Sequence, residues 1–417
     1  MRSGTAEIRL TPGQGNGAET KGGNTVQEIA QTRKGLFALI VAVTVLPIFL
    51  EGFDGQLFFF DAPYIMHSVG VSPAFIGVAA SGFAVGILVF SFLGGYLFDR
   101  YSAKTAVIIS VAIFSLFTAL TGYVTNLTEV IIYRILVGLG AGLFQTAILS
   151  FLGDIKFSWR AKMVGLFAIF FGVGLAVAPG VGAAFLPSFS TAFLISGVLG
   201  LISLILFLVF VPKTFKRREE RKARLSSQMS LNLVLLMLAV FAFGIAFFAF
   251  ESYISDYLLR GLSFSAGAAA TAITMIGVGT IIASEIAGFA SDKYGRKIVL
   301  ISGSIALIAS SAMMFGVTVG VAAAAALAFL FGAGYASFVA NITAAAQDSV
   351  DEAWVGSATG MVFTTYNLGT ILGGPLLGIA LASGFKMAGL SIITIPSIAA
   401  LLLVSVLRLK SVPKQAP

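Results

Sequence analysis

The chain has 417 residues, of which 58% are hydrophobic and 11% are charged, and its formal net charge is +8. Charged residues make up about a quarter of an ordinary soluble domain, so this composition excludes a soluble globular protein. The absence of cysteine excludes disulfides and thiol chemistry, and the single histidine excludes any site that needs two.

Apolar runs of roughly 20 residues recur along the chain, and each is long enough as a helix to cross a hydrocarbon core of about 30 Å. Only helices or closed barrels satisfy their backbone in lipid, and continuous apolarity at this length is not the alternating pattern of a barrel strand. We therefore predict an all-α membrane protein, a bundle of twelve transmembrane helices at residues 35–60, 73–97, 104–124, 128–151, 162–186, 190–211, 231–257, 265–290, 298–318, 321–346, 355–382 and 387–408.

The polar segments between and around these runs divide the chain into halves. Residues 1–34 are predicted to be a disordered cytoplasmic tail, with no cleavable signal peptide before the first run. The basic stretch 212–230 separates six runs from six and is predicted to be a cytoplasmic linker, the alternative being a surface helix on anionic headgroups. An N-terminal half at 35–211, a C-terminal half at 231–408 and a cytoplasmic tail at 409–417 complete the division.

The basic residues are distributed unevenly between the two sides of the predicted bundle. The tails, the linker and alternate loops carry almost all of them, whereas loops on the other side carry only Arg260 and Lys386. This is the positive-inside pattern, which places both termini in the cytoplasm and the protein in the plasma membrane. The net charge therefore reflects membrane topology, and we expect no nucleic-acid partner.

Two loops have almost the same sequence: Gly95-Tyr-Leu-Phe-Asp99-Arg100-Tyr-Ser-Ala-Lys104 and, 193 residues later, Gly288-Phe-Ala-Ser-Asp292-Lys293-Tyr-Gly295-Arg296-Lys297. The two tryptophans, Trp159 and Trp354, also lie at equivalent points, 195 residues apart. Because each half has an even number of runs, both halves enter the membrane from the same side. The sequence thus predicts parallel repeats related by an axis along the membrane normal.

From Leu36 to Leu407 the chain resembles the major facilitator superfamily of secondary transporters. The doubled loop is similar to the family signature Gly-x-Leu-x-Asp-Arg-x-Gly-Arg-Lys, with Ser102 and Ala103 replacing Gly and Arg in the first copy. Residues 133–142 resemble the family's fourth-helix motif, whose arginine is associated with proton coupling. The resemblance implies alternating access between two six-helix halves, with a small-molecule substrate and protons as partners in the lipid bilayer.

Two further motifs resemble different branches of this family. Glu51-Gly52-Phe53-Asp54 is similar to the Asp-Gly-Phe/Tyr-Asp motif of the aromatic acid:proton symporters, with Glu replacing the first Asp. In the fifth run, Gly165, Gly174, Ala178, Pro179 and Gly182 resemble the proton-antiporter motif, with Ala178 and Ala183 each replacing a glycine. The two motifs disagree about the direction of transport, so both directions stay open.

Ionisable side chains inside membrane spans are costly and are functional candidates by default. Glu51 and Asp54 are three residues apart, and Asp61 returns to nearly the same side of the helix as Asp54, which gives an acidic stripe from mid-membrane to the outer mouth. Burial and a neighbouring carboxylate both disfavour the ionised form. We predict proton or substrate binding at Glu51 and Asp54, the alternative being a structural hydrogen bond, and an exposed helix-end position for Asp61.

Arg134 is the one cation predicted inside a span, so it needs an anion. That anion is Asp54, Glu51 or the carboxylate of a substrate held by two parallel hydrogen bonds. The pair is either a permanent structural ion pair or one that exchanges partners when a carboxylate is protonated. Gln145, on nearly the same face, is expected to add a hydrogen bond.

In the second half, Glu251 is the main candidate, and Asp256 is expected to be solvated near the end of its span. The aromatic residues around Glu251 either sandwich a planar ligand or simply pack. Asn367 and Asn341 are lesser polar candidates, Glu285 is expected at a gate, and His67 is expected on the surface of an outer loop.

The doubled loop is predicted to act as a conformational gate, in which Asp99 and Arg100, with Asp292 and Lys293, pair with neighbouring helix ends in one state. The alternative is that these charges only determine topology. The predicted gate comprises Gly95, Asp99, Arg100, Lys104, Gly288, Asp292, Lys293, Arg296 and Lys297. Glycines in the fourth, fifth and eleventh runs are expected to let helices pack closely.

The sequence contains no phosphate-binding loop of the Gly-x4-Gly-Lys-Ser/Thr kind, no metal-ligand cluster and no nucleophile–histidine pair. We therefore expect neither an enzyme nor an ATP-driven pump, and no cofactor or metal. The predicted function is proton-coupled secondary transport of a small organic solute by a monomer. The expected solute is an organic acid, and an aromatic acid is one option. The alternatives are a proton-driven antiporter that exports drugs or metabolites, and a transporter-like sensor that binds ligand without moving it.

Overall fold

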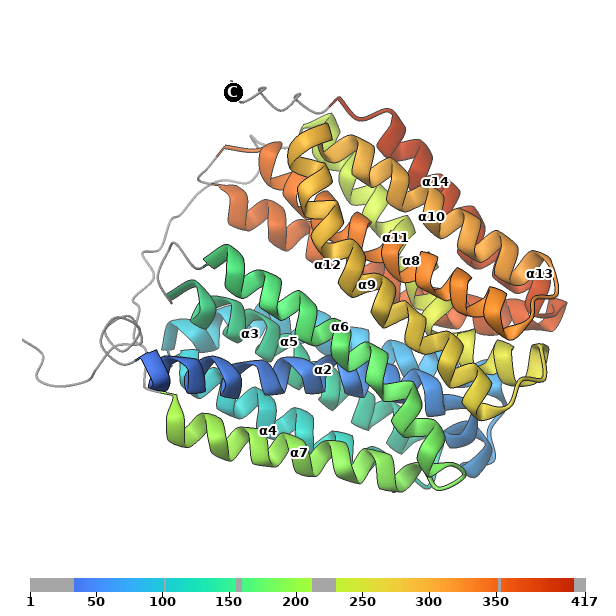
Figure 1. Ribbon diagram of the computed structural model, residues 1–417, viewed down its shortest axis with the longest axis horizontal. Helices are drawn as coiled ribbons and strands as arrows, with labels where there is room; N and C mark the ends of the chain where they lie inside the picture. The colour runs from blue at the N-terminus through green and yellow to red at the C-terminus, as the bar shows by residue number, and fades with distance from the viewer. Residues whose placement is uncertain (1–33, 101–102, 155–159, 212–229, 352–353, 409–417) are drawn as a thin grey trace, which may run out of the picture.

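The computed structural model describes residues 34–100, 103–154, 160–211, 230–351 and 354–408 (Figure 1). The predicted tails and linker fall almost entirely on residues 1–33, 212–229 and 409–417, which lie outside the described ranges. The described residues are helical apart from short connections, so the predicted all-α class is confirmed.

The first six long helices pack together in the lower part of Figure 1. They are α2 (Lys34–Ser68), α3 (Ile76–Arg100), α4 (Ala103–Thr121), α5 (Leu127–Asp154), α6 (Arg160–Phe185) and α7 (Phe189–Phe210). A single 3-10 turn, η1 (Pro73–Phe75), precedes α3. We call this group the N-terminal half.

The remaining helices form the C-terminal half, in the upper part of the same view. They are α8 (Leu231–Asp256) with its π-helical extension η4 (Tyr257–Gly261), α9 (Ala266–Tyr294), α10 (Arg296–Gly316), α11 (Val321–Asp348), α12 (Val355–Ala380) with η6 (Leu381–Ser383), and α13 (Phe385–Gly389), η7 (Leu390–Thr394) and α14 (Ile395–Ser405) in series.

Within the described residues, twelve helices are long and apolar enough to cross a membrane, the number that the sequence predicted. The main difference lies in the first helix, which continues to Ser68 rather than ending at residue 60. Ala62, Ile65 and Met66 are completely buried, so the packed face of α2 extends through these residues. The helix continues with that face, even though Pro63 lies within it.

Equivalent helices make equivalent contacts in the two halves. A Cβ on Gly174 of α6 would lie 2.2 Å from the carbonyl oxygen of Phe49 on α2, and a Cβ on Gly369 of α12 would lie 2.3 Å from that of Phe241 on α8. Only glycine permits such approaches, because any side chain would overlap the neighbouring backbone. The expected role of these glycines in close helix packing is confirmed.

The two halves are joined by hydrogen bonds at one end of the bundle. The Tyr253 hydroxyl on α8 donates to the carbonyl oxygen of Ala74 (2.7 Å) and accepts from the amide of Gly77 (3.0 Å). Further bonds run from Ser255 to the Phe60 carbonyl, from Ser81 to Ile371 and from Thr274 to Ala176.

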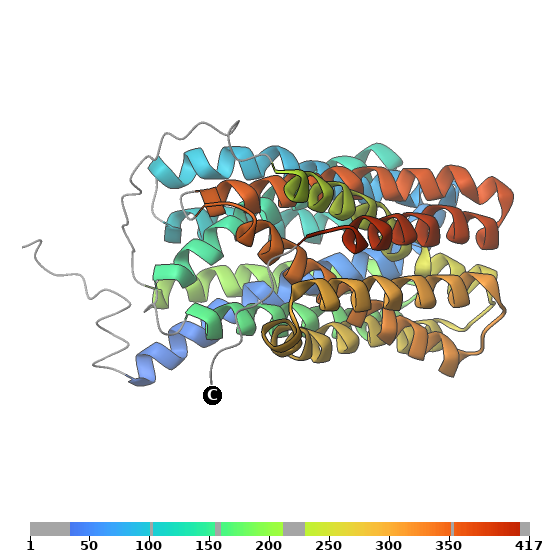
Figure 2. The same ribbon diagram turned by 90° about the horizontal axis from the view of Figure 1, so that it is seen from above.

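We call this the joined end and the opposite one the linker end, where α2 begins and α7 ends. Figure 1 shows the two groups of helices diverging toward the linker end, and Figure 2 shows their long axes running roughly parallel when seen from above. The region between the halves is therefore closed by tight helix packing at the joined end.

Candidate functional site

A fully buried ion pair lies at the centre of the N-terminal half. Nη1 of Arg134 on α5 donates to Oδ2 of Asp54 on α2 at 2.9 Å, and neither side chain is exposed. Thr118 of α4 donates to the other carboxylate oxygen at 2.8 Å. The guanidinium lies over the rings of Phe58 and Phe83, with its carbon 4.3 and 4.7 Å from their centroids. Four helices thus enclose the pair.

The environment of this pair is unusual for two charges. Removing them from water is costly, and the cost is offset only by close pairing and further hydrogen bonds. Asp54 has both, but Nε and Nη2 of Arg134 have no hydrogen-bond partner among the described residues. Of the three anions that the sequence offered to Arg134, the structure places Asp54 against it and leaves two guanidinium nitrogens unused.

Glu51 lies one turn before Asp54 on α2 and is also buried. Nε2 of Gln145 on α5 donates to its Oε1 at 2.6 Å, while Oε2 has no partner among the described residues. Gln145 therefore bonds Glu51, whereas the sequence had placed it on the face of Arg134. This carboxylate is held by one donor only.

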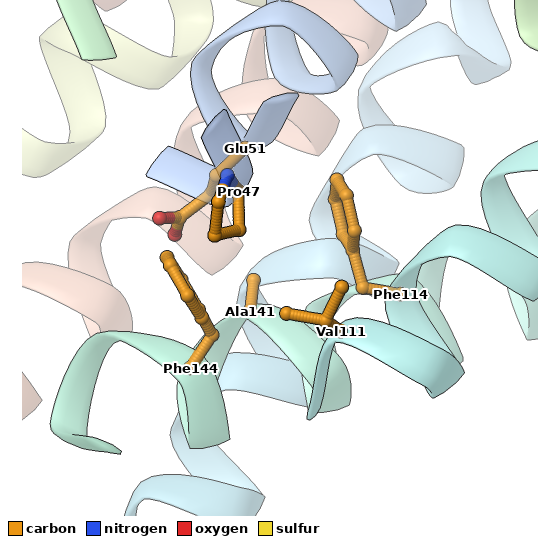
Figure 3. Close-up of a pocket in the computed structure, with 6 residues that line it drawn as sticks. All are labelled: Pro47, Glu51, Val111, Phe114, Ala141 and Phe144. Atoms are coloured by element: carbon orange, nitrogen blue, oxygen red, sulfur yellow. The ribbon is translucent and has the colours of Figure 1, made fainter. Parts of the chain in front are cut away.

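A small cavity with room for about one water molecule adjoins Glu51. Figure 3 shows Glu51 and Pro47 of α2 facing Ala141 and Phe144 of α5. Val111 and Phe114 of α4 complete the lining. Apart from the Glu51 carboxylate, the lining is apolar.

Glu251 of α8 brings a carboxylate from the C-terminal half to the same region. It is buried, and it interacts with the amide of Gln56 on α2, across the boundary between the halves. The Tyr335 hydroxyl on α11 interacts electrostatically with both Glu251 and Glu51. Tyr366 on α12 interacts with Tyr335 and Glu251. Acids from both halves therefore share one polar region.

Aromatic rings cover the C-terminal side of this region. Phe243 stacks on Phe338 with centroids 4.4 Å apart, and Phe247 stacks on Tyr335 at 4.3 Å. Tyr366 lies 6.0 Å from the ring of Phe243. We call these five residues the aromatic wall. The sequence pointed to the aromatic residues around Glu251, and one of these, Phe247, packs against Tyr335 of α11 and Tyr366 of α12.

Sequence reasoning missed Gln56, Thr118, Tyr335 and Tyr366. Each is a neutral polar side chain inside an apolar span, and that position was the available signal. Neutral polar residues are common in such helices, and their partners depend on helix packing that a sequence does not give.

Two acidic residues differ from expectation. Asp256, expected to be solvated, is completely buried and ion-paired with the half-exposed Arg260, because η4 carries the helix one turn further. Asp61, expected at an exposed helix end, is completely buried because α2 continues to Ser68. His67 and Glu285 are exposed, although His67 belongs to the last turn of α2 rather than to a loop.

The amide candidates of the second half bond within their own helices. Nδ2 of Asn367 donates to the carbonyl of Phe363 at 2.8 Å, and that of Asn341 donates to Ser337 at 2.9 Å. Both are buried. Among the described residues, no group of three or more His, Cys, Asp or Glu is arranged to hold a metal ion.

Three of the predicted gate residues make contacts within their own half. Lys104 donates to the Leu208 carbonyl at 2.7 Å, Arg296 pairs with Asp348, and Lys297 donates to the Leu407 carbonyl at 2.9 Å. Asp292 and Lys293 are exposed, and Gly288 has open space around it. The side chains of Asp99 and Arg100 fall outside the described part, as does the surrounding of Gly95.

Comparison with known proteins identifies the family. The family model described as Major Facilitator Superfamily matches residues 44–372 and, in a second match, 236–417. The hexuronate transporter of Bacillus subtilis is 28% identical over 374 residues, 80% of this chain and 86% of that protein. The 4-hydroxybenzoate transporter PcaK of Pseudomonas aeruginosa is 32% identical over 142 residues, which is 34% of this chain and 31% of that protein.

Solved structures share the fold at low sequence identity. A D-xylose-proton symporter superposes with a TM-score of 0.73 at 16% identity, covering 89% of this chain and 97% of the other. The D323A mutant of the nucleoside transporter NupG gives a TM-score of 0.70 at 15% identity, covering 88% and 98%. With the twelve apolar helices and the family match over most of its length, the chain belongs to the major facilitator superfamily and is a multi-pass membrane transporter rather than an enzyme.

Proposed function

We propose that this transporter is a proton-coupled carrier of a small organic acid, working by alternating access between its two halves. The buried Asp54–Arg134 pair is the observation that carries the proposal. A proton on Asp54 removes the negative charge of the pair and leaves Arg134 without its anion. The substrate carboxylate then takes that place, so proton binding and substrate binding depend on one another.

The organic-acid assignment has support from the site and from relatives. Arg134 keeps two unused guanidinium nitrogens, which suit a carboxylate held by two parallel hydrogen bonds. Relatives include transporters named for hexuronate and 4-hydroxybenzoate and the "Probable sulfoacetate transporter SauU" of Cupriavidus necator, and all three named substrates are organic anions. The aromatic wall and the hydroxyls of Tyr335 and Tyr366 would face the body of such a substrate.

The arrangement of the halves supports a state open toward the cytoplasm. The hydrogen bonds between the halves lie at the joined end, and the basic residues of the sequence put the linker end inside the cell. In this state the gate residue Arg296 bonds within its own half, to Asp348. We assign Asp99, Arg100, Asp292 and Lys293 to latches that close the linker end in the opposite state.

Purified protein in proteoliposomes tests the proposal, with hexuronate and 4-hydroxybenzoate as labelled probes. Asp54→Asn should abolish uptake driven by a proton gradient while sparing counterflow, because a permanently neutral side chain cannot release a proton. Asp256→Asn, which removes a buried carboxylate outside the site, is the matched control and should keep gradient-driven uptake. Undiminished gradient-driven uptake by Asp54→Asn would remove Asp54 from the coupling mechanism.

A proton-driven exporter is the second candidate. Its support is the antiporter-like glycine pattern of α6 and the quinolone resistance protein NorA of Staphylococcus aureus, 22% identical over 225 residues, 52% of this chain and 58% of that protein. Imposing proton gradients of each sign on the same proteoliposomes decides between the two. Substrate that moves in the same direction as the protons supports import. Substrate that moves only in the direction opposite to the protons supports export.

A further inference from the structure

The carboxyl group of Asp61 has no role in the site described above, yet its position is as costly as that of Asp54. Its side chain is completely buried, and neither carboxylate oxygen has a hydrogen-bond partner among the described residues. It lies against α6, where a Cβ on Gly182 would come within 3.0 Å of its Oδ1. An ionised carboxylate without a cation or a donor is strongly disfavoured inside a membrane protein.

The charged and titratable groups around Asp61 leave it without a counter-ion. Tyr64, one turn further along α2, interacts with it electrostatically. Residues 166–185 of α6, the part of that helix whose side chains the structure describes, and α7 have no ionisable side chain, and α4 has only Lys104 at its far end. On α5, Arg134 is bonded to Asp54, and on α8 Asp256 is paired with Arg260. Hydrogen bonding to a cation therefore does not explain the presence of this acid.

The position of Asp61 along α2 suggests its purpose. Asp61 follows Asp54 by seven residues, two helical turns, so the two carboxyl groups lie on the same face about 10 Å apart. Another seven residues lead from Asp61 to Ser68, the last residue of α2 at the joined end. Asp61 is thus halfway between the ion pair and the solution at that end, with the partly buried Tyr64 between it and the helix terminus.

We propose that Asp61 is a second proton-binding site, through which protons from the joined end reach the Asp54–Arg134 pair. Asp61 gives up its carboxyl proton, which water carries over the intervening distance to the Asp54 carboxylate. Asp61 is left ionised and takes a replacement proton from the solution at the joined end. The inference rests on the proposed proton coupling, and it assigns the route by which the proton enters.

Infrared spectroscopy tests the protonation of Asp61 without any transport. Spectra of purified protein recorded in acidic and alkaline buffer are compared between the wild type and Asp61→Asn. The carbonyl stretching band of a protonated carboxylic acid should lose one component in Asp61→Asn, and Asp256→Asn should leave that component in place. An unchanged band in Asp61→Asn would overturn the proposal.

Transport in proteoliposomes tests the relay. Asp61→Asn should slow gradient-driven uptake by at least about tenfold. This threshold is set lower than the hundredfold or more that a positioned proton-transfer group contributes to a rate. The rate of counterflow and its KM should stay unchanged. Undiminished gradient-driven uptake in Asp61→Asn, alongside its loss in Asp54→Asn, would overturn the relay alone. Undiminished uptake in both variants would instead overturn the proposed coupling at Asp54.

Discussion

The hydroxyl of Tyr253 on α8 bonds two backbone groups of the opposite half at once, the carbonyl of Ala74 and the amide of Gly77. The side chain is completely buried. One oxygen atom thus connects the C-terminal half to the start of α3. Because a substitution can delete that atom and keep the ring, its contribution to the joined end is open to direct measurement.

Tyr253→Phe should favour opening of the joined end. The change removes the hydroxyl from the part-buried Ala74 carbonyl and from the buried Gly77 amide, and leaving a buried group unpaired costs about 1–3 kcal/mol. The chain has no cysteine, so a cysteine introduced at the buried Ser81 reports opening through its rate of thiol labelling. We expect labelling at least about tenfold faster in Tyr253→Phe, the ratio that corresponds to about 1.4 kcal/mol.

Tyr257→Phe is the matched control for this measurement. Its hydroxyl donates at 2.8 Å to the carbonyl of Met314, within the C-terminal half, so its loss should destabilise that half without opening the joined end. Equal labelling rates in the wild type and Tyr253→Phe would show that the hydroxyl does not hold the halves together.

Gly77→Ala should separate the halves at the same end. A Cβ on Gly77 of α3 would lie 2.1 Å from the backbone of Gly374 on α12, so the two helices must move apart to accommodate it. Cysteines that replace the exposed Ser72 and Ser383, one in each half, can carry spin labels. Pulsed electron paramagnetic resonance then measures the distance between the two labels. We expect a longer and broader distance distribution.

Gly267→Ala provides the comparison, because a Cβ at that position of α9 meets nothing within 4 Å. It should leave the distribution unchanged. If Gly77→Ala gave the wild-type distribution with unchanged folding, the close approach of α3 and α12 would have no part in closing the joined end.

The sequence predicted the fold well because hydrophobic length and repetition are local properties that can be read without packing. Twelve spans followed from apolar runs alone, and close helix packing followed from glycines such as Gly174 and Gly369. Helix ends were less certain, since Asp61 and Asp256 belong to helices that continue because of contacts with other helices. An isolated charged residue near the end of an apolar run reads as solvent-exposed until those contacts are known.

The sequence predicted which charged residues lie in the candidate site, but it did not predict which of them pair with one another. Asp54 and Arg134 are 80 residues apart, and only the packing of α2 against α5 selects Asp54 over Glu51 as the partner. The same packing turns Gln145 toward Glu51. Gln56 of α2 comes near Glu251 of α8 only when the two halves meet, and the sequence pattern of either half alone does not show that contact.

Arg134 and Asp54 should behave as a unit in their effect on stability. Arg134→Met leaves the Asp54 carboxylate buried with only Thr118 as its donor, and breaking a buried pair in this way costs about 3–5 kcal/mol. Adding Asp54→Asn removes the stranded charge, so the double variant should be more stable than Arg134→Met alone. Thermal unfolding of the detergent-solubilised single and double variants measures this coupling.

Additive losses in those variants would contradict the expected coupling. Two independent contributions would mean that the contact between Arg134 and Asp54 adds no stability of its own. The proposed exchange of partners would then lack its starting state, since a proton on Asp54 would not free Arg134 from any attraction.

Glu51 and Gln145 offer a test by exchange of side chains. Gln145→Glu places two carboxyl groups at a contact of 2.6 Å, where both cannot ionise together, so this variant should lose the most thermal stability and counterflow. Glu51→Gln removes the acid and should lose less thermal stability and counterflow.

The double variant Glu51→Gln with Gln145→Glu restores one acid facing one amide across the same two helices. We expect it to recover stability and counterflow above the Gln145→Glu level, because the pairing rather than the order of the two side chains sustains the contact. A double variant no better than Gln145→Glu would show instead that the acid must project from α2, close to Asp54.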